Sequence, residues 1–320
     1  MNSNVTRRLQ PTPDRYSLEK SFGRLLLAVL LFQLVSGLRA QSAGTEETKV
    51  SDDDMQIDGV FNSALPGTVK KHRVKLLFRP HFGDFHRKDY LRVPLSLRYG
   101  ITGQWEVTGG VEGYFSHGFG DKNWFEKNGF SSLNLSTKYR IGQRLWAHWD
   151  TGVGVDYRTP VSSPPSDVSD GLRHLSYYAS FSRELESLPD WRVFWNVGAD
   201  DVSTTGRPVV LEKNDLGDDS VNVTGGVVWQ RAHHSYTFEA SYATTRLTGI
   251  RNRDVFSIRP GIIWKLPKKY TFNAKGDWFL GVSTRVSHGT DGSDFGLSGK
   301  LRVSFNFKQW WRSKFPKETN

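Results

Sequence analysis

The stretch Leu145–Tyr157 reads LWAHWDTGVGVDY and alternates between two kinds of residue. Every second residue from Leu145 is apolar or nearly so, whereas the residues between them are mostly small, polar or charged. A period of two predicts a β-strand with two unlike faces. The apolar face covers about seven alternate positions, which is longer than a typical soluble strand and close to what a tilted strand needs to cross a bilayer. The stretch therefore predicts one strand of a membrane barrel.

The same alternation recurs along most of the chain and predicts about twelve strands. They cover residues 73–82, 90–101, 105–115, 132–141, 145–157, 174–185, 191–200, 221–230, 236–243, 255–266, 278–287 and 295–307. Short connections alternate with long polar ones at 116–129, 159–173 and 201–220, and the connection 267–277 is a long exception on the short side. This arrangement is typical of outer-membrane barrels. The predicted fold is all-β, a transmembrane antiparallel up-and-down β-barrel spanning residues 72–307. We expect a bulge or a strand end at Pro80, Pro94 and Pro260.

The ends of the chain differ from the strand region. An apolar run of about eleven residues, Leu25–Val35, follows Arg7, Arg8, Lys20 and Arg24, and small residues come after it. This pattern predicts a secretory signal peptide over residues 1–40, because the run is too short to span a membrane as a helix. Residues 41–71 are polar and are expected to form either a disordered periplasmic segment or a plug folded into the lumen. Residues 308–320 form a basic tail.

Large aromatic residues gather at one end of the predicted barrel. At the short-turn ends of the strands, the outward positions include Tyr99, Trp105, Tyr139, Trp191, Trp229, Tyr236, Trp264, Trp278 and Phe307. Such side chains have an apolar body and a polar tip, so they settle at the level of the lipid headgroups. This ring predicts a bilayer interface.

With this ring and these strands, the chain resembles the bacterial outer-membrane β-barrel class from Arg73 to Phe307. Its last strand, GKLRVSFNF, is similar to the aromatic-ended terminal strand that the barrel assembly machinery recognises in that class. The resemblance implies insertion into the cell outer membrane, with the assembly machinery and the outer-membrane lipids as partners.

The inward positions are rich in positive charge, and the whole chain has a net charge of +10. By strand parity the predicted lumen lining contains Arg73, Lys75, Arg79, Arg92, Arg98, Lys138, Arg140, Arg259, Arg285, Lys300 and Arg302. Glu106, Glu112, Asp150, Asp156 and Glu239 face them. Twelve strands leave a narrow or partly plugged pore, in which guanidinium and ammonium groups favour anions. The picture is similar to the twelve-stranded channels for acidic oligosaccharides. An internal salt-bridge network is the alternative.

Other classes of function lack support in the sequence. An outer-membrane lipid hydrolase needs a Ser and a His together on the lipid-facing surface, but His81 and His148 have inward parity. His174 and His288 lie near loops and are expected to be solvated. The acidic clusters at 214–219 and 291–294 lack the full calcium-loop spacing, so no metal site and no cofactor are expected. No nucleic-acid reader motif accompanies the basic residues.

The sequence therefore predicts a passive outer-membrane channel for small polar or anionic solutes, without catalytic residues. The alternative is a structural or adhesive barrel with a closed lumen, in which the extracellular loops act. Barrels associated with the degradation of aromatic compounds resemble the chain about as well as the oligosaccharide channels do.

Overall fold

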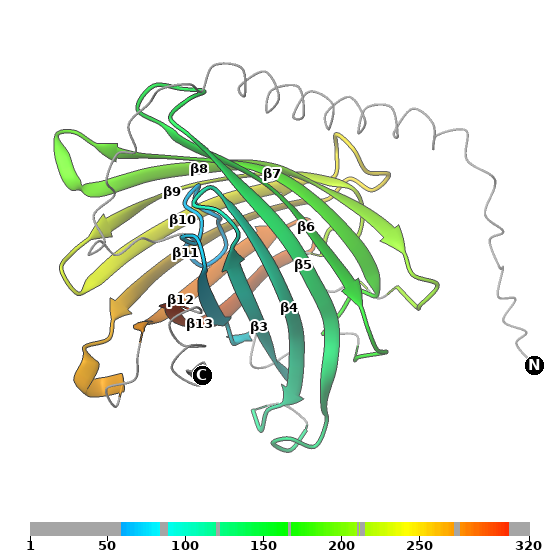
Figure 1. The fold of residues 1–320 in the computed structure, drawn as a ribbon. Coiled ribbons are helices and arrows are strands. Elements are labelled where there is room, and N and C mark those ends of the chain that lie inside the picture. The colour runs from blue at the N-terminus through cyan, green and yellow to red at the C-terminus, as the bar shows by residue number, and fades with distance from the viewer. Residues whose placement is uncertain are drawn as a thin grey trace, which may run out of the picture. The chain divides into compact units, whose positions relative to one another are not determined.

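The strands form one antiparallel sheet that closes on itself. The computed structural model describes residues 59–83, 89–119, 122–165, 168–209, 211, 215–271 and 276–306. From β2 to β13, each strand in this part of the chain pairs with the next along the sequence, and β1 pairs with both β3 and β13 (Figure 1). The sheet is therefore a barrel without a free edge. The predicted signal peptide, residues 41–58, Phe307 and the basic tail lie outside the described residues.

The strands are long and differ somewhat from the predicted ranges. They are β1 (Arg73–Phe78), β2 (His81–Phe82), β3 (Tyr90–Gly100), β4 (Trp105–Ser116), β5 (Asn128–Gly142), β6 (Asp150–Pro160), β7 (Leu172–Leu185), β8 (Leu188–Thr204), β9 (Ser220–Gln230), β10 (His234–Thr244), β11 (Asp254–Lys265), β12 (Asp277–Gly289) and β13 (Gly292–Asn306). A 3-10 helix, Lys268–Thr271, lies between β11 and β12. No helix among the described residues is long and apolar enough to cross a membrane.

Thirteen labelled strands correspond to twelve passages through the barrel. Against β3, Phe78 of β1 pairs with Leu95 and His81 of β2 pairs with Arg92, so the register is the same on both sides of the gap. The register against β13 is also kept. β1 and β2 are therefore one strand interrupted at Arg79 and Pro80, and the predicted twelve-stranded barrel is confirmed.

The prolines lie where pairing with one neighbouring strand is open. Pro80 interrupts the first strand, as expected. Pro94 lies within the unbroken β3, at the level of this interruption, and its carbonyl accepts a hydrogen bond from the Arg79 amide at 2.9 Å. Pro260 lies within β11, where the pairing with β12 passes from Ile258 to Gly261. The expectation of a bulge or strand end is therefore wrong for Pro94 and Pro260, because a gap in one ladder accommodates the missing N–H without a change of register.

The two faces of the barrel differ as a membrane wall requires. The outward side chains of Leu97, Phe256 and Val286 are 49%, 50% and 47% exposed, although they are large and apolar. The inward side chains of Lys138 and Glu239 are buried. In water such an exposed apolar belt is unfavourable, whereas hydrocarbon solvates it. The outer surface of the barrel wall is therefore suited to contact with lipid.

The stretch Leu145–Tyr157 is only partly a strand. β6 begins at Asp150, and the residues from Gln143 to Trp149 form a turn in which His148 has a φ of 67°. Leu145, Ala147 and Trp149 fall at alternate positions in this turn, so the turn has the apolar spacing of a strand. The Trp149 ring stacks on that of Trp146 with the centroids 5.2 Å apart. The predicted inward direction of His148 is therefore wrong, because it is an exposed turn residue. The connection between β12 and β13 is short, although it lies on the long-loop side.

Candidate functional site

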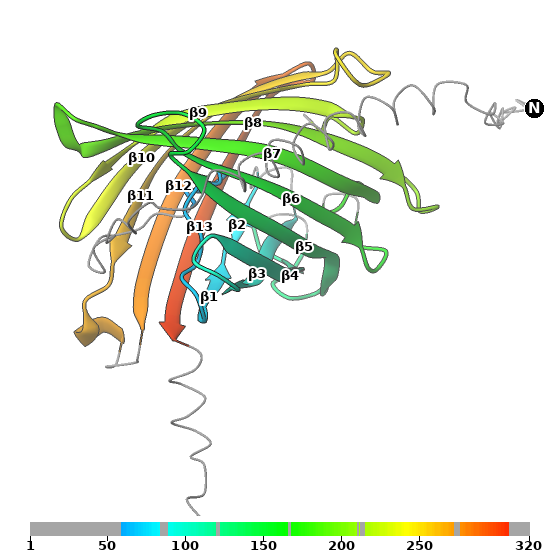
Figure 2. The same ribbon diagram turned by 45° about the horizontal axis from the view of Figure 1, so that its top comes forward.

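A cavity of about 470 Å³ lies inside the barrel. Strands β1, β3 to β8 and β13 contribute to its lining, together with residues 59–64 from the chain before β1. These residues lie within the ring of strands in both ribbon views (Figures 1 and 2). The size suits a small solute, since ligand cavities are typically about 300–1,000 Å³.

Positive charge is in excess around this cavity. Its lining includes Lys75, Arg79, Arg98, Lys138, Arg158, Lys300 and Arg302, against Glu106, Glu112, Asp156 and Asp200. Six of these cations belong to the lining set that strand parity predicts. Arg158 does not, although it follows the inward Asp156 by two residues, because the predicted strand ends at Tyr157 whereas β6 continues to Pro160. Extending the alternation from Asp156 by two residues would have placed Arg158 on the inner face.

The other predicted lining residues are held elsewhere on the inner face. Arg73 pairs with Asp277 at 3.3 Å, Arg140 with Asp150 at 3.0 Å and Arg285 with Asp294 at 2.7 Å. Arg259 donates to Ser298 Oγ at 3.3 Å, and Arg92 pairs in register with Tyr114. Part of the basic set therefore forms the internal ion pairs that the alternative interpretation expects.

Arg79 is the cation best placed to meet a solute. It lies in the interruption between β1 and β2, and its backbone amide is bonded to Pro94. Among the described residues, no hydrogen bond or ion pair is made by its guanidinium group, which lines the cavity. A guanidinium presents five N–H donors in a planar fork that matches a carboxylate or a phosphate. An anion in the cavity would satisfy these donors.

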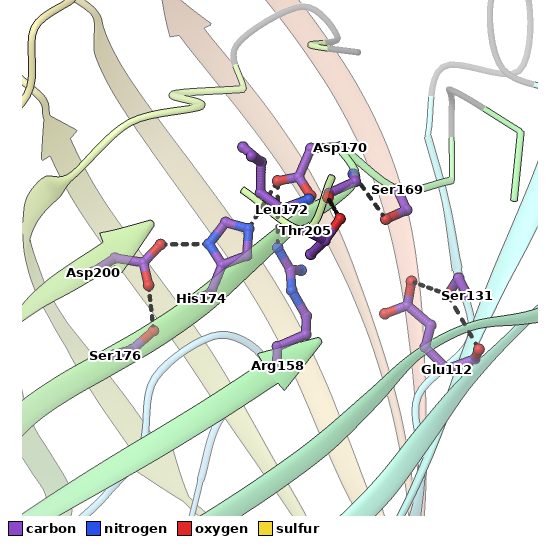
Figure 3. Close-up of polar contacts among 11 residues, drawn as sticks. Glu112, Ser131, Arg158, Ser169, Asp170, Leu172, His174, Ser176, Asp200 and Thr205 are labelled. Carbon is purple, nitrogen blue, oxygen red and sulfur yellow. Dashed lines mark hydrogen bonds and ion pairs between the residues drawn. The ribbon is translucent and has the colours of Figure 1, made fainter. Parts of the chain in front are cut away.

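A hydrogen-bonded cluster lies at the long-loop end of the cavity (Figure 3). His174 Nδ1 contacts Asp200 at 2.7 Å and Nε2 contacts Asp170 at 2.8 Å, and Ser176 Oγ donates to Asp200 at 2.7 Å. Arg158 lies 3.7 Å from Asp170. The expectation that His174 is solvated is therefore wrong, because both ring nitrogens are bonded to carboxylates. The cluster ties the loop before β7 to the barrel wall.

The Asp170 carboxyl, in that loop, is strongly acidic. Burial alone would raise its pKa, but the hydrogen bond from His174 and the charge of Arg158 outweigh burial and lower the pKa to about 2. Asp170 is thus ionised at neutral pH, and its negative charge holds its two partners together.

The aromatic residues of the predicted interface lie on the outer side at the short-turn end. Trp191 pairs with Trp229 across β8 and β9, and Trp229 in turn pairs with Tyr236 on β10. Their rings stack with centroids 5.7 and 5.3 Å apart, and Arg231 lies 4.6 Å from the Trp229 ring. Strand ends at the same side of the barrel also carry Tyr99, Trp105, Tyr139, Trp264 and Trp278.

Comparisons with known proteins identify the fold. No family model and no curated protein matches the chain. An outer-membrane channel from Pseudomonas putida F1 is 11% identical with a TM-score of 0.50, and the match covers 75% of this chain and 97% of that one. The NanC porin is 12% identical (TM-score 0.45, 72% and 98% covered), and the KdgM porin in complex with disordered oligogalacturonate is 10% identical (TM-score 0.45, 72% and 99% covered).

The chain has the fold of an outer-membrane β-barrel channel. At these identities the likeness concerns the path of the backbone. The charges in the lumen depend on the residues of this chain, and the likeness does not extend to them.

Proposed function

We propose that this protein is a passive channel of the outer membrane that favours small polar or anionic solutes. The observation that carries the proposal is the cavity inside a closed membrane barrel, lined by more cations than carboxylates. In a confined space with low-dielectric walls, an excess of fixed positive charge raises the local concentration of anions. The guanidinium of Arg79 supplies donors for a carboxylate or a phosphate.

Planar-bilayer recording tests this proposal. The folded protein is reconstituted, single-channel currents are recorded, and the reversal potential is measured under a salt gradient. We expect discrete current steps and a reversal potential on the anion-selective side. A cation-selective reversal potential would contradict the anion preference, and the absence of current in all conditions would contradict the channel itself.

A closed structural or adhesive barrel is the second candidate, because aromatic side chains are exposed on the long connection between β4 and β5. Phe119, Trp124 and Phe125 are 61%, 49% and 61% exposed, and the Trp124 ring lies 5.4 Å from Phe119 and 6.1 Å from Phe125. Such a group of rings can contact an external surface. This candidate predicts a silent bilayer recording together with a loss of surface binding when Trp124 is replaced by Ser.

A further inference from the structure

A buried carboxylate holds the chain before β1 inside the barrel. Glu239, on β10, is 2% exposed. Its oxygens accept hydrogen bonds from the backbone amides of Phe61 at 2.9 Å, Asn62 at 3.1 Å and Ser63 at 2.9 Å, and from Ser63 Oγ at 2.6 Å. Successive backbone N–H groups directed at one anion form a binding nest, and such charge-assisted bonds are strong. Here the wall supplies the anion and the chain supplies the nest.

Two lysines of the barrel wall donate hydrogen bonds to carbonyl oxygens in the same stretch before β1. Lys300 Nζ on β13 donates to Gly59 O and Val60 O, both at 2.6 Å. Lys138 Nζ on β5 donates to Leu65 O at 3.1 Å and to Gly67 O at 2.5 Å. Polar backbone groups without regular secondary structure need partners when they are buried. Charged side chains on separate strands provide them here.

Apolar contacts complete the fit between this chain and the wall. Val60 and Leu65 form a buried cluster with Phe194 and Val228, and Phe61 forms another with Ile263 and Phe279. Two glycines of the wall leave room for Phe61, because a Cβ at Gly261 would lie 2.5 Å from Phe61 Cε2, and one at Gly281 would lie 3.0 Å from Phe61 Cζ. The wall therefore has a shaped seat for residues 59–71, which we call the interior segment.

We propose that the interior segment is a resident plug of the channel and that Glu239 is its latch. The carbonyl oxygens of the segment occupy Lys300, a cation of the lumen that an anionic solute would use, and Lys138, which also lies 3.2 Å from the Glu106 carboxylate. A carboxylate binds an ammonium group more strongly than a neutral carbonyl does, so anionic solutes compete with the segment for Lys300. Loss of the Glu239 charge weakens the acceptor of the backbone nest and loosens the segment, whose other end is held by Glu106 through the Val69 amide at 2.7 Å. The inference rests on the proposed channel function.

A disulfide between segment and wall tests whether the segment is seated. The chain contains no cysteine, so Pro66→Cys with Gly152→Cys introduces a single pair. A Cβ at position 152 would lie 3.0 Å from the Cα of Pro66, so the two positions are within reach of a disulfide once the segment shifts by a few tenths of an ångström. We expect rapid cross-linking under mild oxidation in the folded protein, with folding checked by the β-sheet circular dichroism of each variant. A folded barrel that fails to cross-link would overturn the plug.

Adding Glu239→Gln to the cysteine pair tests the latch. We expect cross-linking to slow by about tenfold or more, since several bonds to a charged acceptor are weakened together. Asp219→Asn is the matched control, because Asp219 is also a buried carboxylate that accepts a backbone N–H, from Val202 at 2.8 Å, but it lies at the start of β9, away from the segment. An unchanged rate in Glu239→Gln, or an equal loss in the control, would overturn the latch.

Bilayer recordings of the same variants separate this inference from the proposed function. We expect the reduced Glu239→Gln variant to conduct several-fold more than the parent, and oxidation to reverse the gain. Slower cross-linking with no rise in a measurable current would overturn the plug. Slower cross-linking with no current in any variant would support the latch and contradict the channel.

Discussion

Glu239 and Arg79 show two ways in which this barrel keeps a charge inside a membrane. A buried charge is costly unless it is bonded. Glu239 meets this requirement with four donors from the interior segment. Arg79 faces the cavity, where water or a solute can accept hydrogen bonds from its guanidinium group. The first residue is therefore suited to holding structure and the second to selecting a solute.

Replacing Arg79 by Glu should change the selectivity of the channel. The substitution exchanges a cation for an anion beside Glu112 and Asp156, so we expect a several-fold fall in the anion-to-cation permeability ratio, measured from the reversal potential. Arg246→Glu makes the same change of charge on an exposed loop and should leave the ratio nearly unaltered. Equal shifts in the two variants would show that Arg79 does not line the conducting path.

The loop before β7 should be held less tightly in strong acid. The pKa of Asp170 is lowered from 3.8 to about 2 in the folded state, so its ionised form stabilises the fold above about pH 4. This stabilisation is lost as the pH falls through about 2. We expect pepsin to cleave the loop faster between these values, and Asp170→Asn to be cleaved at a rate that lacks this step. A step of the same size in the variant would contradict the assignment to Asp170.

At the scale of elements, alternation along the chain predicts the faces of the strands well. Each predicted strand has a counterpart in the barrel, because side-chain direction in a strand depends only on parity. The error at Leu145–Trp149 arises because Leu145, Ala147 and Trp149 fall at alternate positions in the turn, as apolar residues do in a strand. The residue at which a strand ends is also hard to predict, and for this reason the predicted strand stops at Tyr157, one residue before Arg158.

The interior segment could not be placed from sequence. It has no periodicity, and its bonding partners are remote, since Lys300 lies 240 and 241 residues from Val60 and Gly59. The cluster around His174 was missed for a similar reason, because its carboxylates come from a loop and from the next strand. Alternation reports which face a residue occupies and not which residues meet across the lumen.

A charged residue on the outer face of β12 should destabilise the barrel. Val282 points outward near the middle of β12, is 40% exposed, and lies in register with Ile262 of β11. In a bilayer, Val282→Arg should reduce the free energy of unfolding by about 2 to 4 kcal/mol, as expected for Arg on the lipid face near the midplane. Chemical denaturation in lipid vesicles measures the change. Ile250→Arg, at a loop position that is 89% exposed, is the control and should have little effect. Equal stability of both variants would contradict a lipid-facing β12.

At the scale of the whole molecule, the barrel separates two environments. The outer side carries apolar residues with aromatic rings near the short turns, and the inner side carries charged residues and the interior segment. The closed sheet satisfies backbone hydrogen bonds without a free edge, which a membrane requires. The apolar residues, which would be exposed to water in a soluble protein, therefore contact lipid, and the charged residues lie inside the barrel.

Quenching of tryptophan fluorescence by brominated lipids tests this arrangement most directly. The chain has 11 tryptophans, and Trp105, Trp191 and Trp229 lie at the outer, short-turn end of their strands. In vesicles, we predict strong quenching by lipids brominated near the headgroup and weaker quenching by lipids brominated near the chain ends. Fluorescence of the folded protein that neither kind of lipid quenches would show that hydrocarbon does not surround the barrel, and would contradict the account.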